Sequence, residues 1–342
     1  MRFNKNYVVF ITVQTTLGQR YLYYTQASVN KGIRGKKGNF IHHGLGRISR
    51  NGSWQTITRN LLEDLQEFEP DNQILSVNGF LIRGNGRIDN ITLSGNQKTA
   101  GNWYHPTQLT SWQLQLQGAV NTNHDADLYD VDLFDTSTAL IQQLHASAKK
   151  VVCYFSAGSY EKWRTDADQF EAADLGKPLD GWPGERWLDV RSDNVREIMR
   201  NRLDLAVQKG CDGVDPDNMD GYTNNPGFSF TAKDQLAYNK LIASEAHSRN
   251  LAVGLKNDLD QVKELASVYD FAVNEQCFQY NECDLLTPFI ALGKAVLNVE
   301  YKQRYVDDSA ARNKLCSNAG NRQFSTLILP LQLNDAYRLS CL

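Results

Sequence analysis

The 342-residue sequence lacks the features that mark membrane and nucleic-acid-binding proteins. No apolar run approaches the roughly 18 residues that a membrane-spanning helix needs. The formal net charge of -3, with 22% charged residues, provides no basic field for nucleic acid or an anionic membrane. The apolar start, residues 1–16, breaks at Gln14 without a small-residue cleavage site, so no signal peptide is evident. We expect a globular monomer that neither enters a membrane nor binds nucleic acid.

Motifs for metals, phosphates and serine nucleophiles are also missing, since the sequence contains no HExxH, P-loop or GxSxG. The acidic stretch CDGVDPDNMDGY, residues 211–222, could suggest a calcium loop. With Asp215 at the first position, Met219, Asp220 and Pro226 stand where such a loop needs Asp or Asn, Gly and Glu. We therefore expect no metal and no organic cofactor.

Six cysteines are present, none of them before Cys153, and no CxxC accompanies them. The segment CFQYNEC, from Cys277 to Cys283, closes a small loop typical of a disulfide, and Cys341 could tie the C-terminus back to Cys316. This even number favours an oxidising compartment, so we expect a secreted protein. The alternative is a cytosolic enzyme with buried free thiols.

Residues 1–93 alternate apolar and polar residues between turn signals, as β-strands do. LLEDLQEF is the one helical pattern there. The expected strands are YVVFITVQTT, QRYLYYT, WQTITRNL, QILSVNGFLIRG and GRIDNITL. We predict a small all-β, jelly-roll-like sandwich, followed by a polar linker over residues 94–111.

From residue 112 to residue 342, short apolar runs alternate with helical stretches. One helix is well marked by Ser192 as its N-cap and Gly210 as its stop. The eight expected strands are WQLQLQ, DLYDVDLF, VVCYFSA, CDGVDPD, LAVGLKN, FAVNEQ, AVLNVEY and FSTLILP. With no GxGxxG after the first, this pattern predicts an α/β fold of the (β/α)8 TIM-barrel type.

Acidic residues gather at the ends of these strands, where barrels of this type place catalytic groups. They are Asp130, Asp132, Asp215, Asp217, Glu275 and Glu300, with Lys256 and Asn257 after the fifth strand. Converging carboxylates raise one another's pKa, and a carboxylate pair is the means of glycoside hydrolysis. A single Asp at a strand end can instead be a helix cap or a salt-bridge partner, which fits Asp135, Asp220 and Asp258.

Several aromatic residues near strand ends or in long loops admit two interpretations. They could fill the core or stack on sugar rings. They are Tyr154, Trp163, Trp182, Trp187 and Tyr222.

The region from about residue 112 to residue 342 resembles glycoside hydrolase family 114, the endo-α-1,4-polygalactosaminidases. The motifs that carry the resemblance are YDVDLFDT, VCYFSAGSYEKWR, GERWLDVR, CDGVDPDNMDGY, VGLKND, VNEQCFQYNEC and GKAVLNVEY. The resemblance implies a secreted enzyme that cleaves α-1,4-linked galactosamine polymers of microbial exopolysaccharides and fungal walls. It also implies Asp217 and Glu275 as the catalytic carboxylates, with Asp215 as the alternative to Asp217.

A de-acetylated galactosamine polymer carries protonated amines, which explains the local acidity. On this interpretation Asp130, Asp132, Asp215 and Glu300 bind the amines, Tyr154 also contacts substrate, and Lys256 and Asn257 position ring hydroxyls. Lys256 could instead lower the pKa of a neighbouring carboxyl group. A hydrolase of another α-galactoside and a non-catalytic polysaccharide-binding protein remain as alternatives.

Residues 1–93 lie outside this family resemblance. GSWQTITRNL and GNGRIDNITL are similar to jelly-roll modules attached to carbohydrate-active enzymes, although the segment is shorter than such modules. Sugar binding and a purely structural role are both open for it.

Overall fold

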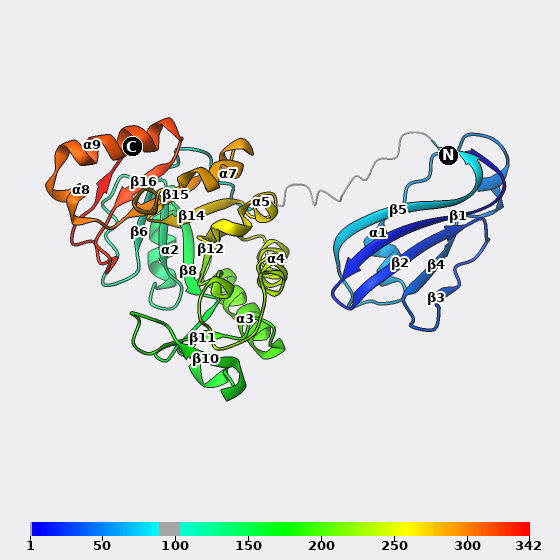
Figure 1. The fold of residues 1–342 in the computed structure, drawn as a ribbon, viewed down its shortest axis with the longest axis horizontal. Coiled ribbons are helices and arrows are strands. Elements are labelled where there is room, and N and C mark those ends of the chain that lie inside the picture. The colour runs from blue at the N-terminus through cyan, green and yellow to red at the C-terminus, as the bar shows by residue number, and fades with distance from the viewer. Residues whose placement is uncertain (1, 89–102) are drawn as a thin grey trace. The chain divides into compact units, whose positions relative to one another are not determined.

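The computed structural model describes residues 2–88 and 103–342. The chain divides into two compact units, Met1–Gly95 and Asn96–Leu342, and each is described by itself (Figure 1). Within the described residues, no helix is both long enough and apolar enough to cross a membrane.

The first unit is one five-stranded sheet with the strand order β3-β4-β2-β1-β5. Its elements are β1 (Arg2–Thr15), β2 (Gly18–Thr25), β3 (Gly32–Arg34), β4 (Phe40–Gly44), α1 (Leu61–Gln66) and β5 (Ile74–Arg87). Alternation along β1 and β2 places Val9, Ile11 and Leu22 on one face, where they pack with Leu65 of α1. The other face of the sheet is not part of this core.

The sandwich predicted for residues 1–93 is not confirmed. Residues 2–88 form a single sheet with a short helix on one face, and no second sheet is present among them. WQTITRNL was predicted to be a strand, but residues 54–60 have no regular structure, and the side chain of Asn60 caps α1 by accepting from the Leu62 and Glu63 amides. Most of GRIDNITL lies outside the described residues.

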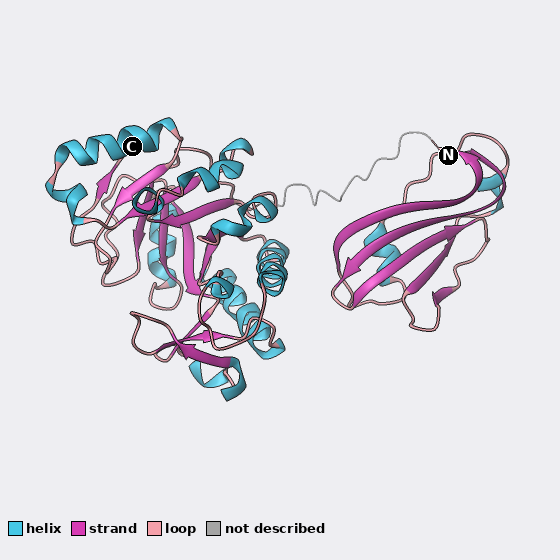
Figure 2. Ribbon diagram, in the orientation of Figure 1, coloured by secondary structure: helices cyan, strands magenta, loops and turns pink. Residues whose placement is uncertain are grey.

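The second unit is built on a curled sheet of nine strands, in which eight parallel strands follow one another in chain order (Figure 2). The ninth strand, β17 (Leu339–Ser340), pairs antiparallel with β16. All eight predicted strands are confirmed. They are β6 (Trp112–Gln115), β7 (Leu128–Asp132), β8 (Lys150–Ser156), β12 (Gly213–Asp217), β13 (Ala252–Lys256), β14 (Phe271–Glu275), β15 (Val296–Glu300) and β16 (Ser325–Ile328).

Helices connect most of these strands and cover the outer face of the sheet. They are α2 (Thr138–Ala146), α3 (Asp193–Lys209), α4 (Ala232–Ser248), α5 (Val262–Leu265), α6 (Cys277–Tyr280), α7 (Thr287–Ala291), α8 (Gln303–Asp307) and α9 (Ser309–Asn321). As predicted, the Ser192 side chain caps α3, and Gly210 ends it at φ 90°. Between residues 103 and 342, no helix joins β6 to β7 or follows β16, so the unit is less regular than eight repeated strand–helix pairs.

The C-terminal segment lies between the first and last parallel strands. β6 and β16 share no backbone ladder in the described part of this unit. Instead Leu116 N donates to Leu333 O at 3.0 Å, Arg338 Nη2 donates to Trp112 O at 2.7 Å, and Trp112 Nε1 donates to Ser325 O at 2.9 Å. The predicted disulfide from Cys316 to Cys341 is present and fixes this segment.

The linker predicted over residues 94–111 is shorter than expected at its C-terminal end. Trp103 Nε1 donates to Asp270 Oδ1 at 3.1 Å, and Gln108 Nε2 donates to Ile290 O at 2.7 Å. Residues 103–111 therefore pack against the second unit, whereas residues 94–102 lie outside the described residues.

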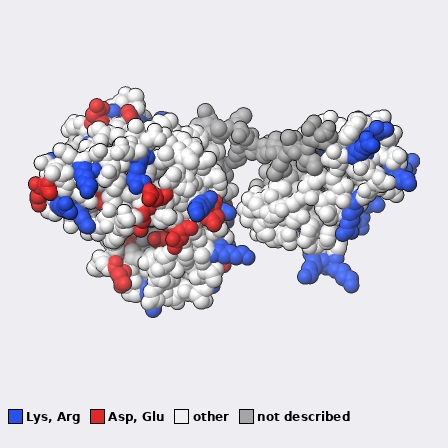
Figure 3. All heavy atoms as spheres, turned by 45° about the horizontal axis from the view of Figure 1, so that its top comes forward, with Lys and Arg blue, Asp and Glu red and all other residues white. Residues whose placement is uncertain are grey.

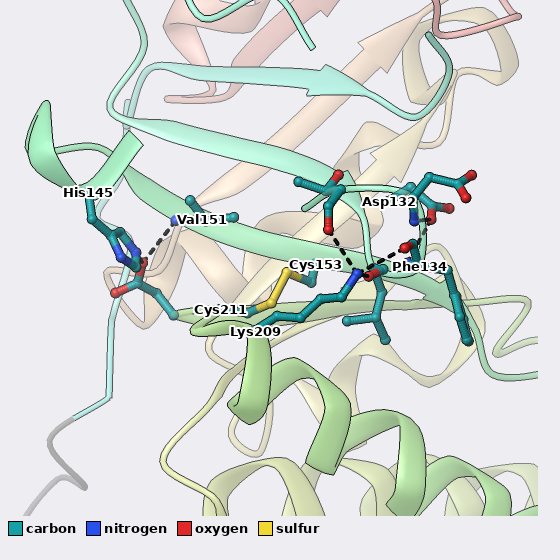
Figure 4. The surroundings of a disulfide bond; sticks show 11 residues. Asp132, Phe134, His145, Val151, Cys153, Lys209 and Cys211 are labelled. Carbon is teal, nitrogen blue, oxygen red and sulfur yellow. Dashed lines mark hydrogen bonds and ion pairs between the residues drawn. A yellow bond between two sulfur atoms is a disulfide. The ribbon is translucent and has the colours of Figure 1, made fainter. Parts of the chain in front are cut away.

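Two further disulfides stabilise the second unit. Cys277 and Cys283 are bonded as predicted, and Cys153 of β8 is bonded to Cys211, just before β12 (Figure 4). Beside the latter, the Lys209 ammonium donates to the carbonyls of Leu133, Phe134 and Thr136 in the loop after β7. These bonds hold the ends of β7, β8 and β12 in fixed relation.

We predict that the two disulfides differ in their effect on stability. In the loop-entropy relation, the bond closing 58 residues is worth about 4 kcal/mol and the bond closing 6 residues about 2 kcal/mol. Cys153→Ala with Cys211→Ala should therefore lower the free energy of unfolding more than Cys277→Ala with Cys283→Ala. Urea unfolding followed by tryptophan fluorescence checks this, because five of the six tryptophans lie in the second unit. Equal losses would contradict it.

Candidate active site

The carboxyl ends of the parallel strands surround a cleft of about 800 Å³. Asp217 at the end of β12 and Glu275 at the end of β14 both line it. Asp132, Tyr154, Lys256 and Asn257 line it as well, so six of the predicted site residues are brought together there. This convergence follows from the parallel sheet, in which all strands end at the same edge.

Asp217 is held by donors on both oxygens. Tyr154 Oη donates to Oδ2 at 2.9 Å, and the backbone amide of Asn218 donates to Oδ1 at 2.7 Å. The Lys256 ammonium lies 4.0 Å from Oδ2. The carboxylate is therefore fixed in one orientation while its side chain remains 20% exposed to the cleft.

Glu275 is held in the same manner from other strands. Tyr301 Oη donates to Oε1 at 2.5 Å, and Asn257 Nδ2 donates to Oε2 at 3.1 Å. The Asn257 amide oxygen also accepts from the Glu275 backbone amide at 2.9 Å, which fixes the end of β14. Asn257 has a φ of 50°, a left-handed conformation that Asn tolerates better than most residues.

Lys256 is buried beneath the cleft among carboxylates. Its ammonium donates to Asp215 Oδ2 at 3.0 Å and lies 5.1 Å from the centre of the Tyr154 ring. Burial alone lowers the pKa of Lys256, but the charges of Asp215, Asp217 and Glu275 raise it well above its ordinary value. Lys256 therefore stays charged and offsets part of the repulsion among the acids.

Asp215 and Asp130 lie below the cleft lining and are fully buried. Burial raises the pKa of Asp215 to about 6, although Lys256 opposes the shift. Burial and the neighbouring charge of Asp215 raise the pKa of Asp130 well above its usual range. Both effects favour the protonated form of Asp130, whose O–H can donate to Oδ1 of Asp215, an oxygen with no other partner in the described part of the chain.

Asp132 reaches the cleft. The amine-binding role predicted for it requires an unpaired carboxylate, but the carboxylate of Asp132 is paired. Its two oxygens accept from Arg164 Nη1 at 3.0 Å and Nη2 at 2.7 Å. Arg164 also pairs with Glu161, which neutralises a second buried acid. Local sequence patterns do not show this pairing, because Arg164 lies 32 residues away from Asp132, in the loop after β9 (Ser159–Glu161).

Glu300 does not line the cleft and cannot bind substrate there. On β15 the side chains of Val299 and Leu297 face the interior of the curled sheet, so Glu300 points to the opposite face. There its Oε1 accepts from the Phe278 amide at 2.9 Å, and burial raises its pKa. Tyr301, the next residue, is the one that reaches the site.

The cleft lining is strongly acidic, beyond the residues predicted from the sequence. It holds eight carboxyl groups against the cations of Arg164, Lys177 and Lys256. The eight are Asp132, Asp135, Glu161, Asp180, Glu185, Asp217, Asp220 and Glu275. Figure 3 shows carboxylates gathered at a hollow on this unit.

Asp220 and Glu185 are two cleft residues that strand-end reasoning missed. Asp220 lies on the turn after β12 and faces the cleft, so an exclusively structural role does not describe it; burial raises its pKa to about 6. Burial raises the pKa of Glu185, on the strand β11 (Glu185–Leu188), to about 7. Asp258, by contrast, lies outside the cleft lining and accepts from Tyr222 and Asn239, as a structural role predicts.

The aromatic residues divide between the two roles considered for them. Trp163 and Trp182 line the cleft and are 51% and 48% exposed, so their rings are open to a ligand. Trp187 and Tyr154 line it but are more deeply packed. Tyr222 does not line it.

No metal site is evident in the described part of the chain. The described residues contain no cluster of three or more His, Cys, Asp or Glu side chains that could hold an ion.

Comparison with known proteins identifies the family. The model of the glycoside-hydrolase family GH114 matches residues 93–342, well over half of the chain. The chain belongs to glycoside hydrolase family GH114. The match starts before residue 112, which agrees with the packing of residues 103–111 against the second unit. A search of curated proteins found no match.

Two solved structures resemble this GH114 enzyme. Ega3 of Aspergillus fumigatus, solved in complex with galactosamine, is 44% identical over 70% of this chain and 100% of its own, with a TM-score of 0.66. The glycoside hydrolase domain of PelA from Pseudomonas aeruginosa covers 67% of this chain and 98% of its own at a TM-score of 0.55. At 14% identity, the second shows a shared fold only.

A chain of hydrogen bonds in this hydrolase links the wall of the cleft to the residue after Asp217. The Ser159 hydroxyl donates to Glu185 Oε2 at 2.7 Å and lies 2.7 Å from the Ser156 hydroxyl. Asn218 Nδ2 donates to Ser156 Oγ at 2.9 Å. This chain fixes the turn that presents the Asn218 amide to Asp217.

Substitutions of the two buried aspartates should separate a neutral from a charged role. In Asp130→Asn an amide N–H replaces the carboxylic O–H, so we expect hydrolysis within about threefold of the parent, less than 1 kcal/mol. Asp215→Asn removes the counter-charge of Lys256. Breaking a buried pair lowers the free energy of unfolding by about 3 to 5 kcal/mol, and the uncompensated ammonium of Lys256 beside Asp217 should also lower hydrolysis well below that of Asp130→Asn.

The release of reducing ends from polysaccharide substrate measures both variants, with thermal unfolding as the check on folding. An inactive but folded Asp130→Asn enzyme would mean that Asp130 is charged and contacts substrate, as the family resemblance implied.

Proposed function

We propose that this GH114 enzyme is an endo-acting hydrolase of α-1,4-linked galactosamine polymers whose amines are at least partly free. The observation that carries the proposal is the acidic cleft around Asp217 and Glu275. A neutral polysaccharide gains nothing from eight carboxyl groups, whereas a polymer of protonated amines is attracted by them. The 44% identity to Ega3, whose structure holds galactosamine, supports the same substrate class.

Asp217 and Glu275 supply the two carboxyl groups that glycoside hydrolysis requires. One protonates the oxygen of the departing sugar, and the other attacks the anomeric carbon or activates a water molecule. Tyr154 and Tyr301 each donate to one member of the pair, so both carboxyl groups are oriented before substrate arrives. Lys256 lies behind them and limits the build-up of negative charge.

The remaining acidic residues and the exposed indoles serve binding. Asp220, Asp180 and Asp135 lie around the pair, where their carboxylates can pair with sugar ammonium groups. Trp163 and Trp182 offer apolar faces for pyranose rings. A cleft with these groups along its walls suits internal segments of a chain, which is why we propose endo-cleavage.

We also propose a location and a domain organisation for this enzyme. The three disulfides support a secreted protein, because such bonds persist in oxidising surroundings. We propose that the second unit is a (β/α)8 barrel in which the C-terminal segment completes the circle, and that it acts as a monomer. Residues 1–93 would be an accessory domain, joined by a linker that ends before Trp103.

Neutral replacements of the catalytic pair test the proposed chemistry. A positioned acid or base contributes about 100-fold to 10,000-fold, so Glu275→Gln and Asp217→Asn should each lower the rate at least about 100-fold. The substrate is de-acetylated α-1,4-galactosamine polymer, and the readout is new reducing ends together with product length.

Exposed acids on α3 provide matched controls for the change of charge. Asp193→Asn and Glu197→Gln remove the same charges at positions 100% and 62% exposed, and both should keep the parent rate. Parent-like hydrolysis by either Asp217→Asn or Glu275→Gln would refute the assigned pair.

A further inference from the structure

The two units of the chain carry opposite charge. Residues 2–88 contain twelve Lys and Arg against five Asp and Glu, a formal net charge of +7. Residues 103–342 contain 23 Lys and Arg against 33 Asp and Glu, a net charge of -10. A basic unit attached to an enzyme with an acidic cleft repels the cationic substrate that the cleft attracts. The positive charge of the first unit therefore does not serve to attract this substrate.

The five acids of residues 2–88 are confined to one region. They lie between Glu63 and Asp71, on α1 and the turn after it, and α1 packs on one face of the sheet. Glu69 pairs with Arg20 and Asp64 with Arg59, so two of the unit's cations are neutralised there. The face of this unit seen in Figure 3 shows cations and no carboxylates.

A shallow hollow of about 790 Å³ lies on the opposite side of the sheet, and every charged residue in its lining is a cation. Its lining includes residues from the strands β2, β4 and β5, and from the 3₁₀ helix Arg47–Arg50, which follows β4. None of its lining residues is an Asp or Glu. The residues that give it its character are Tyr23, Lys31, His42, Arg47, Arg50 and Arg83.

The four permanent cations of the hollow have no anionic partner among residues 2–88. No ion pair involves Lys31, Arg47, Arg50 or Arg83 there; Arg50 Nη1 donates to the neutral Asn6 side chain at 2.5 Å, and Arg83 lies over the Phe10 ring. Like charges gathered on one concave surface repel each other. An anion bound between them would remove that repulsion and form charge-assisted hydrogen bonds.

His42 adds polarity to this hollow but no charge. Its Nδ1 accepts from the Lys31 amide at 3.1 Å, so the proton of the neutral ring is on Nε2 and points to Thr25 Oγ1 at 2.8 Å. Burial and the nearby charge of Lys31 lower the pKa of His42, which keeps the ring neutral. The charge of the hollow is therefore independent of pH near neutrality.

The neighbouring aromatic rings favour a polysaccharide over a single-stranded nucleic acid. Such nucleic acids bind by stacking bases on exposed aromatic faces. Here Phe10 stacks on Tyr23 at 5.6 Å between ring centres, Tyr21 stacks on Phe40 at 4.7 Å, and Arg83 covers Phe10. One face of each of these rings is covered by its neighbour, and Arg83 also lies over Phe10, so recognition depends mainly on the guanidinium and ammonium groups.

We propose that this hollow binds an anionic polysaccharide through its carboxylate or sulfate groups. Arg47, Arg50 and Arg83 can each form paired hydrogen bonds to such a group, and Lys31 adds a fourth charge. A polymer of protonated amines attracts polyanions, so an anionic polysaccharide can lie beside the substrate of this enzyme. The first unit would hold the enzyme on that counter-polymer. Only this last step rests on the proposed function.

Removal of two cations from the hollow tests the site in the full-length chain. We expect Arg47→Gln with Arg83→Gln to weaken binding of polygalacturonate, a carboxylate polymer, at least about tenfold, equivalent to about 1.4 kcal/mol. Calorimetry at low salt measures it, and dextran sulfate in a parallel titration shows whether carboxylate or sulfate binds more tightly. Hydrolysis of soluble galactosamine polymer should be unchanged, which separates this proposal from the proposed function.

The matched control is Lys36→Gln with Lys37→Gln, which removes the same charge from an exposed turn outside the hollow. It should keep the affinity within about twofold, below 0.5 kcal/mol. Equal weakening by both double variants would show general electrostatic attraction and overturn the site. Absence of binding to either polyanion, or tighter binding of single-stranded DNA of equal charge, would also overturn the proposal.

Discussion

The active site depends on one buried ammonium group. Lys256 is 2% exposed and lies 3.0 Å from Asp215 and 4.0 Å from Asp217, beneath the carboxyl ends of β12 and β13. Several carboxyl groups could not share this site as anions without a cation among them, because their mutual repulsion is weakly screened there. Protonation of Asp130 relieves the remaining repulsion. The Lys256 ammonium and the proton on Asp130 thus reduce the repulsion among the acids around residues 211–222. Asp217 can then face the cleft.

Charge is graded with depth in this enzyme. A neutral Asp130 and the pair of Asp215 with Lys256 form the base, Asp217 and Glu275 stand above them, and less buried acids surround the opening. Arg164 pairs with Asp132 and Glu161 in the wall of the cleft and neutralises part of its negative charge. The arrangement keeps the proposed catalytic pair oriented by neutral donors, while the acids of the outer cleft attract cations. The basic first unit extends this separation of charge to the whole chain.

Local patterns predicted much of this molecule, and long-range pairing explains what they missed. All eight parallel strands and the caps of α3 follow from periodicity and single residues. Asp132 was misjudged because its partner Arg164 lies 32 residues away, which no local pattern shows. Glu300 was misjudged because its side chain points to the opposite side of the sheet from that of Tyr301, the residue directly after β15. Alternation in residues 1–93 predicted β1, β2 and β5, but it wrongly predicted a strand at WQTITRNL and could not tell one sheet from two.

The central claim is that the acidic cleft selects a polymer of protonated amines, and substrate charge tests it most directly. The measurement is kcat/KM on fully de-acetylated and fully N-acetylated α-1,4-galactosamine polymers of equal length, at low and at high salt. The account predicts at least about tenfold preference for the de-acetylated polymer, reduced at high salt because ions screen the exposed carboxylates. Equal rates on the two polymers, or a preference for the acetylated one, would contradict it.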